Sequence, residues 1–303
     1  MNERIYDMLI VGGGPGGYGA ALYAARAGMS VLVLEKLSAG GQMAESPQID
    51  NYPGIVEGID GFTLGQQMKT HAEKFGAQTR LTEVNKLSFN GDIKTAETTD
   101  GVFSGRTLVI ATGAEPKRLG VPGEQELLGR GVHYCAACDG MFYRGKMVAV
   151  VGGGNTAAAD ALLLSRVAQK VLLVHRRDSL RASQVYHKPL LEAENVEFHW
   201  NSAVTEIRPG ELVLQNLTTG EESALPCDGV FVAVGRQPAT ELVKDALELD
   251  EKGYILAGES TATNIPGVYA GGEVRTKALR QIVTAVADGA TAVHQAEEYM
   301  AKK

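Results

Sequence analysis

The stretch YDMLIVGGGPGGYGAALYAARAGMSVLVLEK, residues 6–36, decides the fold. A short apolar run leads into a cluster of glycines, which is followed by an alanine-rich segment and a second apolar run. This order predicts a strand, a helix and a strand, because two parallel strands need a crossover between them. The same order returns in KMVAVVGGGNTAAADALLLSRVAQKVLLVHRR, residues 146–177. The repetition predicts an α/β protein with two Rossmann-like, dinucleotide-binding domains.

Other segments indicate how the two domains divide the chain. The apolar runs at residues 107–112 and 229–234 are typical of central strands that are covered on both faces. Residues 113–124 are rich in glycine and proline and predict a crossing between domains, and a second crossing is expected at residues 235–246. We therefore expect a discontinuous first domain and an inserted second domain, with the boundaries 1–115 and 245–303 for the first and 116–244 for the second.

Composition excludes several classes of protein. The chain has 303 residues, of which 44% are apolar and 21% are charged, as in globular proteins. A net charge of −7 argues against a general binder of nucleic acid or anionic membranes, since these need a basic face. The sequence lacks an apolar run long enough to span a membrane, and its start resembles neither a signal peptide nor a transit peptide. Three cysteines are too few for a disulfide scaffold, so we expect a reducing compartment, the cytoplasm.

The first glycine cluster contains a G-x-G-x-x-G fingerprint formed by Gly12, Gly14 and Gly17. In this motif the first glycine permits a tight turn, the second lets the backbone approach a pyrophosphate, and the third lets helix and strand pack closely. Glu35 ends the second apolar run, where a carboxylate can accept hydrogen bonds from both ribose hydroxyls. The context favours a nucleotide with a free ribose over the alternative, a glycine-rich turn without a ligand.

The second fingerprint keeps Gly152 and Gly154, and Ala157 stands in place of the third glycine. Where the first copy has Glu35, this copy has His175, and arginines follow it in the run HRRDSLR. A carboxylate would repel a 2′-phosphate, whereas guanidinium groups pair with it. We therefore expect NADP(H) here, the alternative being a solvated charged turn. The residues expected at the phosphate are His175, Arg176, Arg177 and Arg181.

A pair of cysteines, Cys135 and Cys138, stands shortly before the second fingerprint in the stretch CAACDG. Half of a zinc site is one reading, but such sites commonly need a second cysteine pair or two histidines. The only other cysteine, Cys227, is isolated in the sequence, and although His133 lies close, no fourth ligand is obvious. Two inert core cysteines are another reading. The C-x-x-C spacing near a βαβ pattern is more typical of a redox-active pair, and no metal is expected.

Together these motifs resemble the low-molecular-weight, bacterial-type thioredoxin reductases, which are flavoenzymes. The resemblance covers nearly the whole chain. It implies the fold of the pyridine-nucleotide disulfide oxidoreductases, with FAD in the first domain and NADPH in the inserted domain. It is carried by the first fingerprint and by GGQMAESPQIDNYPG (40–54), ATGAEPKRLGVPGE (111–124), CAACDG, GGGNTA, HRRDSLRA, VFVAVGRQPAT, PGVYAGGE and RQIVTA.

The resemblance also implies which residues contact each cofactor. At FAD they are Gly12, Gly14, Pro15, Gly17, Glu35, Lys36, Gly41, Gln42, Asn51, Ala111, Thr112, Gly113, Gly272, Glu273, Arg280, Gln281 and Ile282. At NADPH they are Gly152, Gly154, Asn155, Thr156, His175, Arg176, Arg177, Arg181 and Arg236. The chain departs from the family at Glu273, where aspartate is usual, at Ala159, where many relatives have an acid, and at Ala239, where asparagine is usual.

The activity that the resemblance implies is the reduction of thioredoxin by NADPH. Electrons pass through FAD to a disulfide between Cys135 and Cys138, of which Cys138 lies nearer the flavin and Cys135 attacks the partner's disulfide. Asp139 is expected to move a proton, the alternative being a simple turn residue. The inserted domain would rotate between half-reactions about crossings near residues 113–117 and 241–246, because NADPH and the dithiol must both meet the flavin.

Arg130, Met141 and Phe142 flank the dithiol and are expected to contact the redoxin partner, the alternative being ordinary packing around the turn. The resemblance further implies a homodimer. Other readings keep the flavin and the dithiol but take a peroxiredoxin-type redoxin as acceptor, or a donor other than NADPH. A flavin reductase, or a nucleotide-binding scaffold without activity, would leave the cysteine pair unused.

Overall fold

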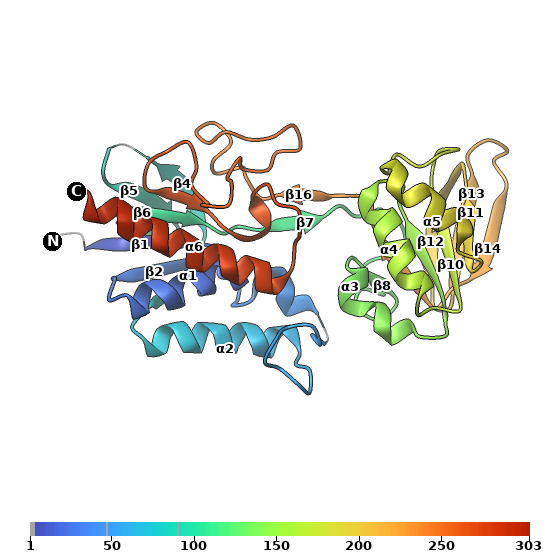
Figure 1. The fold of residues 1–303 in the computed structure, drawn as a ribbon, viewed down its shortest axis with the longest axis horizontal. Helices are drawn as coiled ribbons and strands as arrows, with labels where there is room; N and C mark the ends of the chain where they lie inside the picture. Colours follow the sequence, from blue (N-terminus) through green and yellow to red (C-terminus); the bar gives the residue numbers. More distant parts are fainter. Residues whose placement is uncertain (1–3, 47, 90) are drawn as a thin grey trace. The chain divides into compact units, whose positions relative to one another are not determined.

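Each of the two fingerprints forms a strand, a helix and a strand, and each belongs to a separate unit of the fold. The computed structural model describes residues 4–46, 48–89 and 91–303. The first unit comprises Met1–Glu115 and Gln237–Lys303, and the inserted unit comprises Pro116–Arg236. In Figure 1, where colour follows the sequence, the first unit therefore contains both the blue and the red ends of the chain.

Within the described residues, seven strands form the sheet of the first unit: β1 (Ile5–Val11), β2 (Val31–Glu35), β3 (Gln78–Leu81), β4 (Val84–Ser88), β5 (Lys94–Thr98), β6 (Gly101–Ile110) and β17 (Val268–Ala270). Their order is β3-β2-β1-β6-β5-β4, and β17 pairs with β6. β3, β2, β1, β6 and β17 are parallel, whereas β4 and β5 extend the sheet in antiparallel fashion.

Side chains of the central strand alternate between two cores. Met8 and Ile10 face a core that they share with the helices α1 (Pro15–Arg26), α2 (Gly61–Lys74) and α6 (Ile282–Ala301). Leu9 and Val11 face the opposite core, which the segment around Ile255 completes. Because successive side chains of a strand point to opposite faces, a strand that is covered on both sides is apolar throughout.

The inserted unit repeats this design on a smaller scale. Its parallel sheet has the order β11-β10-β9-β15-β8, and β12, β13 and β14 form an antiparallel sheet. One face of the parallel sheet packs against α4, and the other packs against β12 and β13. The bounds are β8 (Val132–His133), α3 (Ala136–Asp139), β9 (Met147–Val151), α4 (Asn155–Ser165), β10 (Lys170–Val174), α5 (His187–Glu192), β11 (Val196–His199), β12 (Ser202–Arg208), β13 (Glu211–Asn216), β14 (Glu222–Pro226) and β15 (Gly229–Val232).

Short 3-10 turns complete the described chain: η1 (Gly41–Glu45), η2 (Gly140–Tyr143), η3 (Gln184–Tyr186) and η4 (Gly272–Val274). Among the described helices, none combines the length and the apolar character that a membrane span requires. The α/β fold with two Rossmann-like parallel sheets, expected from the sequence, is confirmed.

The chain passes between the units at two short strands, β7 (Ala114–Pro116) and β16 (Arg236–Pro238), which pair with each other. The inserted unit thus ends at residue 236, earlier than the expected boundary at residue 244. Val243 and Leu247 explain the difference, because both are buried in the core of the first unit. Their segment therefore belongs to the first unit, and residues 241–246 do not form the crossing.

Candidate active site

The first fingerprint joins β1 to α1 through glycines with different roles. A Cβ at Gly17 would overlap the carbonyl oxygen of Gly12, so close packing requires glycine there. At Gly14 a Cβ would meet only the oxygen of Gly40, at 3.9 Å, which leaves space beside the helix start. Gly14 is also the N-cap of α1, and no side chain of the described residues caps the helix. Free N–H groups, the positive end of the helix dipole and open space fit the pyrophosphate of a dinucleotide.

Glu35 lies at the end of β2 and is almost fully buried beside the glycine turn. Its Oε2 accepts a hydrogen bond from the Gly13 N–H at 2.6 Å, and its Oε1 accepts one from the Leu37 N–H at 2.9 Å. These two bonds hold the carboxylate at the edge of the fingerprint, and each oxygen keeps a lone pair. The arrangement fits the ribose hydroxyls of FAD.

The other residues expected at FAD come from several loops of the first unit. The Ala111 N–H donates to the Val11 oxygen at 2.8 Å, and Thr112 Oγ1 donates to the Ala239 oxygen at 2.7 Å. These bonds fix the end of β6 beside the first fingerprint. Asn51 Nδ2 donates to Gln281 Oε1 at 3.1 Å, although the two residues are far apart in sequence. Asn51 and Gln281 therefore lie together in the first unit.

The closing motif meets the first fingerprint directly. A Cβ at Gly16 would lie 3.3 Å from the Gly272 nitrogen, so the turn η4 approaches the start of α1. Gln281 is the N-cap of α6, where it forms a capping box with Thr284. Ile282 is the first residue of α6.

One cluster near this motif was missed by the sequence analysis. Asp288 on α6 is buried and accepts hydrogen bonds from Arg275, from Lys277 at 2.6 Å and from the Gly272 N–H at 2.8 Å. Burial raises the pKa of the Asp288 carboxyl, but the bonds from Arg275 and Lys277 outweigh it and hold the pKa below its usual range. The cluster thereby fixes η4 against α6. No spacing motif marks it, because its members pair across a loop and a helix.

The second fingerprint repeats the geometry of the first in the inserted unit. Gly154 is the N-cap of α4, which lacks a side-chain cap among the described residues, and a Cβ at Gly154 would meet no atom within 4 Å. The HRRDSLR run folds back onto this turn, because the Arg181 N–H donates to the Gly153 oxygen at 2.7 Å. Asn155 Oδ1 accepts from the Ser183 N–H at 2.7 Å. The expected phosphate-binding run therefore lies beside the start of α4.

His175 occupies the position that corresponds to Glu35, but it is buried against the turn. A Cβ at Gly153 would overlap its imidazole ring, so the ring fills the space next to that glycine. Burial lowers the pKa of His175, and the charges of Arg181, Arg177 and Arg176 lower it further. The imidazole is therefore neutral at pH 7. Arg176, Arg177 and Arg181 are exposed and carry the positive charge of this run.

Cys135 and Cys138 form a disulfide, with their Cα atoms 5.3 Å apart. Cys135 is the N-cap of α3, and its oxygen accepts a hydrogen bond from the Asp139 N–H at 3.1 Å. The two cysteines are partly exposed, unlike inert core residues. Asp139 itself is buried, and its Oδ2 lies 3.0 Å from His133 Nδ1. In the described part of the chain, no group of three or more His, Cys, Asp or Glu residues could hold a metal ion.

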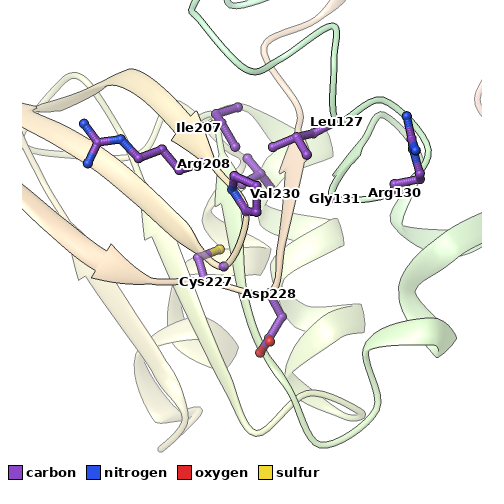
Figure 2. Close-up of a pocket in the computed structure, with 10 residues that line it drawn as sticks. Leu127, Arg130, Gly131, Ile207, Arg208, Cys227, Asp228 and Val230 are labelled. Carbon is purple, nitrogen blue, oxygen red and sulfur yellow. The ribbon is translucent and has the colours of Figure 1, made fainter.

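The third cysteine, Cys227, lies in the wall of a pocket of about 150 Å³ in the inserted unit. Figure 2 shows Arg130 and Arg208 on opposite sides of this pocket. Cys227 Sγ donates to the Gly229 oxygen at 3.2 Å, and burial raises its pKa to about 11. A thiol with such a pKa is inert at neutral pH, so Cys227 packs as a small apolar residue.

The residues expected at a redoxin partner are exposed. Arg130 is exposed at the rim of the Cys227 pocket, and Met141 and Phe142 on η2 expose 56% and 37% of their surface. Because so much of their surface is exposed, the Met141 and Phe142 side chains contribute little to the core of the described chain. They leave an apolar surface next to α3, which carries the disulfide.

Comparisons with known proteins agree with this geometry. Residues 6–289 match the family model described as pyridine nucleotide-disulphide oxidoreductase. A thioredoxin reductase of Bacillus subtilis is 42% identical, with 98% of this chain and 96% of that protein covered. A bifunctional thioredoxin reductase/thioredoxin of Mycobacterium leprae is 42% identical, with 99% of this chain and 67% of that protein covered. The crystal structure of thioredoxin reductase from Streptococcus pyogenes has a TM-score of 0.93 and 41% identity, with both chains fully covered.

Proposed function

Because the chain belongs to the pyridine nucleotide-disulphide oxidoreductase family, we propose that it is an NADPH-dependent flavoprotein that reduces the disulfide of thioredoxin. The observation that carries this proposal is the disulfide between Cys135 and Cys138, next to a fingerprint of the NADP type. Relatives of similar length that are 42% and 43% identical to this chain are named thioredoxin reductases.

FAD belongs to the first unit in this proposal. When bound, it supplies a two-electron link between NADPH and a disulfide. Glu35 orients the ribose, and the free N–H groups at the start of α1 bind the pyrophosphate. The start of α6 at Gln281 would supply a positive dipole end, which would stabilise negative charge on the bound flavin. The remaining contacts are those expected from the sequence, including Lys36, Gly41, Gln42, Gly113, Glu273 and Arg280.

NADPH belongs to the inserted unit. The uncapped start of α4 binds its pyrophosphate, with Asn155 and Thr156 beside it. Arg176, Arg177 and Arg181 pair with the 2′-phosphate, which NADH lacks, so these arginines select the cofactor. Arg236 stands at the start of β16 and completes the expected set of residues.

Thiol–disulfide exchange follows once the pair is reduced. The Cys135 thiolate attacks one sulfur of the thioredoxin disulfide, which forms a mixed disulfide and releases the other sulfur as a thiolate. Cys138 then attacks the Cys135 sulfur, which restores the Cys135–Cys138 disulfide and releases the second thioredoxin thiolate. Asp139 exchanges the proton that Cys138 gains on reduction and loses on attack.

The inserted unit contains both the NADPH fingerprint and the dithiol, and the two must reach the flavin in turn. We propose that the inserted unit rotates between the two half-reactions. Only β7 and β16 join the units in the described chain, and Gly113 and Gly235 beside them have φ angles of 77° and 114°. Glycine tolerates such angles at little cost, so these positions can absorb dihedral changes.

Thioredoxin, or a redoxin like it, docks through Arg130, Met141 and Phe142 in this proposal, since exposed apolar residues with an arginine are common interface anchors. We also propose a homodimer and a location in the cytoplasm. Three cysteines, of which two form the redox pair, suit a reducing compartment.

The proposal is tested with the purified full chain. A yellow protein is expected whose flavin absorbance falls on addition of NADPH, and which then reduces thioredoxin. Cys138→Ser should lose thioredoxin reduction and keep flavin reduction by NADPH, whereas Cys227→Ser should keep both. A Cys138→Ser protein that reduces thioredoxin at the wild-type rate would disprove the assignment. A higher rate with a peroxiredoxin-type redoxin would instead change the acceptor.

A further inference from the structure

Next to the disulfide, three polar side chains form a buried hydrogen-bonded chain, from Asp139 through His133 to Tyr143. His133 Nδ1 lies 3.0 Å from Asp139 Oδ2, and His133 Nε2 lies 2.7 Å from Tyr143 Oη. The three residues are exposed by only 8%, 4% and 6%. Buried polar groups with these distances hold one another firmly, because each lost bond would leave an unpaired group away from water.

Aromatic packing fixes the rings in this chain. The His133 ring stacks on Phe231, with centroids 5.3 Å apart, and the Tyr143 ring meets Phe231 edge to face at 5.5 Å. A Cβ at Gly229 would overlap the Tyr143 ring, so the strand β15 contacts that ring directly. Neither ring can turn without losing these contacts.

The direction of the hydrogen bonds follows from Tyr143. Burial raises its pKa to about 12, and the charges of Asp139, Cys227 and Asp228 add to this effect, while the Lys146 ammonium lies 5.4 Å from the ring. The hydroxyl therefore keeps its proton and can donate it to His133 Nε2. With Nε2 as the acceptor for this hydroxyl, the tautomer of His133 has its hydrogen on Nδ1 and donates it to Asp139 Oδ2.

One atom of this cluster has no partner. Asp139 Oδ1 is buried and accepts no hydrogen bond from any described residue, while Oδ2 is held by His133. On the basis of the proposed function, we propose that His133 and Tyr143 are positioning residues, which hold Asp139 through Oδ2 and leave Oδ1 for proton exchange with the dithiol. When the two electrons that the proposed NADPH-dependent activity supplies reduce the disulfide, the Cys138 sulfur would accept a proton from Oδ1. When the Cys138 thiol attacks the mixed disulfide, the proton returns to Oδ1.

Kinetics test whether His133 acts through Asp139. His133→Gln is expected to lower kcat roughly tenfold or more, with little change in KM for thioredoxin, because docking is untouched. Tyr143→Phe keeps the ring and should give a smaller loss in the same direction. A double variant with Asp139→Asn should be no slower than Asp139→Asn alone. Losses that multiply in the double variant would overturn the proposal.

The matched control is His187→Gln, which removes another histidine of the inserted unit that bonds to a backbone oxygen, at 2.9 Å from Ala182. It should keep the wild-type kcat. The same loss in both variants would show a general effect of histidine removal and would contradict a positioning role.

Two measurements do not depend on turnover. The first is a nuclear magnetic resonance measurement on the ¹⁵N-labelled full chain. The imidazole ¹⁵N shifts of His133, assigned by their loss in His133→Gln, should show hydrogen on Nδ1. Hydrogen on Nε2 would overturn the proposal.

The second is the alkylation of Cys135 and Cys138 in the reduced protein at different pH values. The pH dependence of the alkylation rate should shift in His133→Gln and not in His187→Gln. An unchanged pH dependence in His133→Gln would contradict the positioning role. If the wild type failed to reduce thioredoxin, these two results would still decide the positioning role.

Discussion

Asp288 and Asp160 both lie on helices, the first on α6 and the second on α4. Asp288 is paired with Arg275 and Lys277, and its pKa stays below the usual range in spite of burial. At Asp160, burial raises the pKa to about 6, and the charge of Arg236 offsets only part of that rise. The same side chain is therefore ionised in one place and costly to ionise in the other, and the difference is the number of cations within reach.

Removing the charge of Asp160 is expected to stabilise the protein at neutral pH. The carboxyl of Asp160 loses its proton more easily in the unfolded chain than in the folded protein, because its pKa is raised by folding. The free energy of unfolding therefore falls as the pH rises from about 4 to 6. Asp160→Asn should therefore raise the free energy of unfolding by about 2–3 kcal/mol at pH 7 and by less than about 1 kcal/mol at pH 4. Urea unfolding at the two pH values, in the same cofactor state, measures this.

The control for this prediction is Glu192→Gln, since the Glu192 side chain on α5 is 64% exposed. Its change in stability should be within roughly 0.5 kcal/mol at both pH values. An Asp160→Asn protein whose gain were equal at pH 4 and pH 7 would rule out the ionisation mechanism.

At the scale of elements, the two βαβ units of this chain are built alike and end differently. Gly14 and Gly154 both begin an uncapped helix with open space beside it. The difference lies at the end of the second strand, where Glu35 accepts from the Gly13 N–H, whereas the neutral His175 packs on Gly153. In the proposed function, the strand and helix bind the pyrophosphate in both units, and the loop after the second strand selects between a free ribose and a 2′-phosphate.

The arginines of that loop should therefore control the preference for NADPH. Arg176→Ala and Arg177→Ala are each expected to raise KM for NADPH roughly 10-fold to 100-fold, because each removes a charge-assisted hydrogen bond. The rate with NADH should be unchanged, since NADH has no 2′-phosphate. Steady-state kinetics with both cofactors measure the ratio, and Arg166→Ala, which removes an exposed arginine at the end of α4, is the control. Equal losses with NADPH and NADH would contradict the assignment.

At the scale of the whole molecule, each unit has cores of its own. Helices and segments from both ends of the chain close the first unit, and the inserted unit is one continuous stretch. The pair of strands β7 and β16 is the covalent connection, and two glycines with positive φ flank it. Units that fold around separate cores and share a short connection can change their orientation without unfolding.

Rotation predicts two distances between dyes on the two units. Dyes attached through non-natural amino acids at Val56, which is 96% exposed in the first unit, and at the exposed Glu222 on β14 report this distance. Single-molecule energy transfer should show two populations, whose ratio changes when NADPH or reduced thioredoxin is added. A pair of dyes within the inserted unit, at Val185 and Glu222, should give one unchanging distance. A single distance for the Val56 pair, under all conditions, would exclude the rotation.

Much of the site was predicted from the sequence because its signals are local. Both fingerprints consist of glycines at fixed spacing in one backbone turn. The C-x-x-C pair brings two sulfurs together within one helical turn. The charged residues at the end of each second strand could also be predicted. Glu35 and the HRRDSLR run each follow the second apolar run of a βαβ pattern. The α/β fold and the disulfide could therefore be inferred from residues that are neighbours in the chain.

The tertiary structure alone decided the features that depend on segments distant in sequence or on burial. The second crossing lies at residues 236–238, earlier than expected, because Val243 and Leu247 are buried in a core of the first unit. The Asp288 cluster joins a helix to a loop, and His175 is neutral because Gly153 and its neighbours bury it. The residue types and their spacing in the sequence predict which structure each segment can form locally. Which polar atoms are paired away from water depends on the packing of the whole unit, and that packing sets their charge and their role.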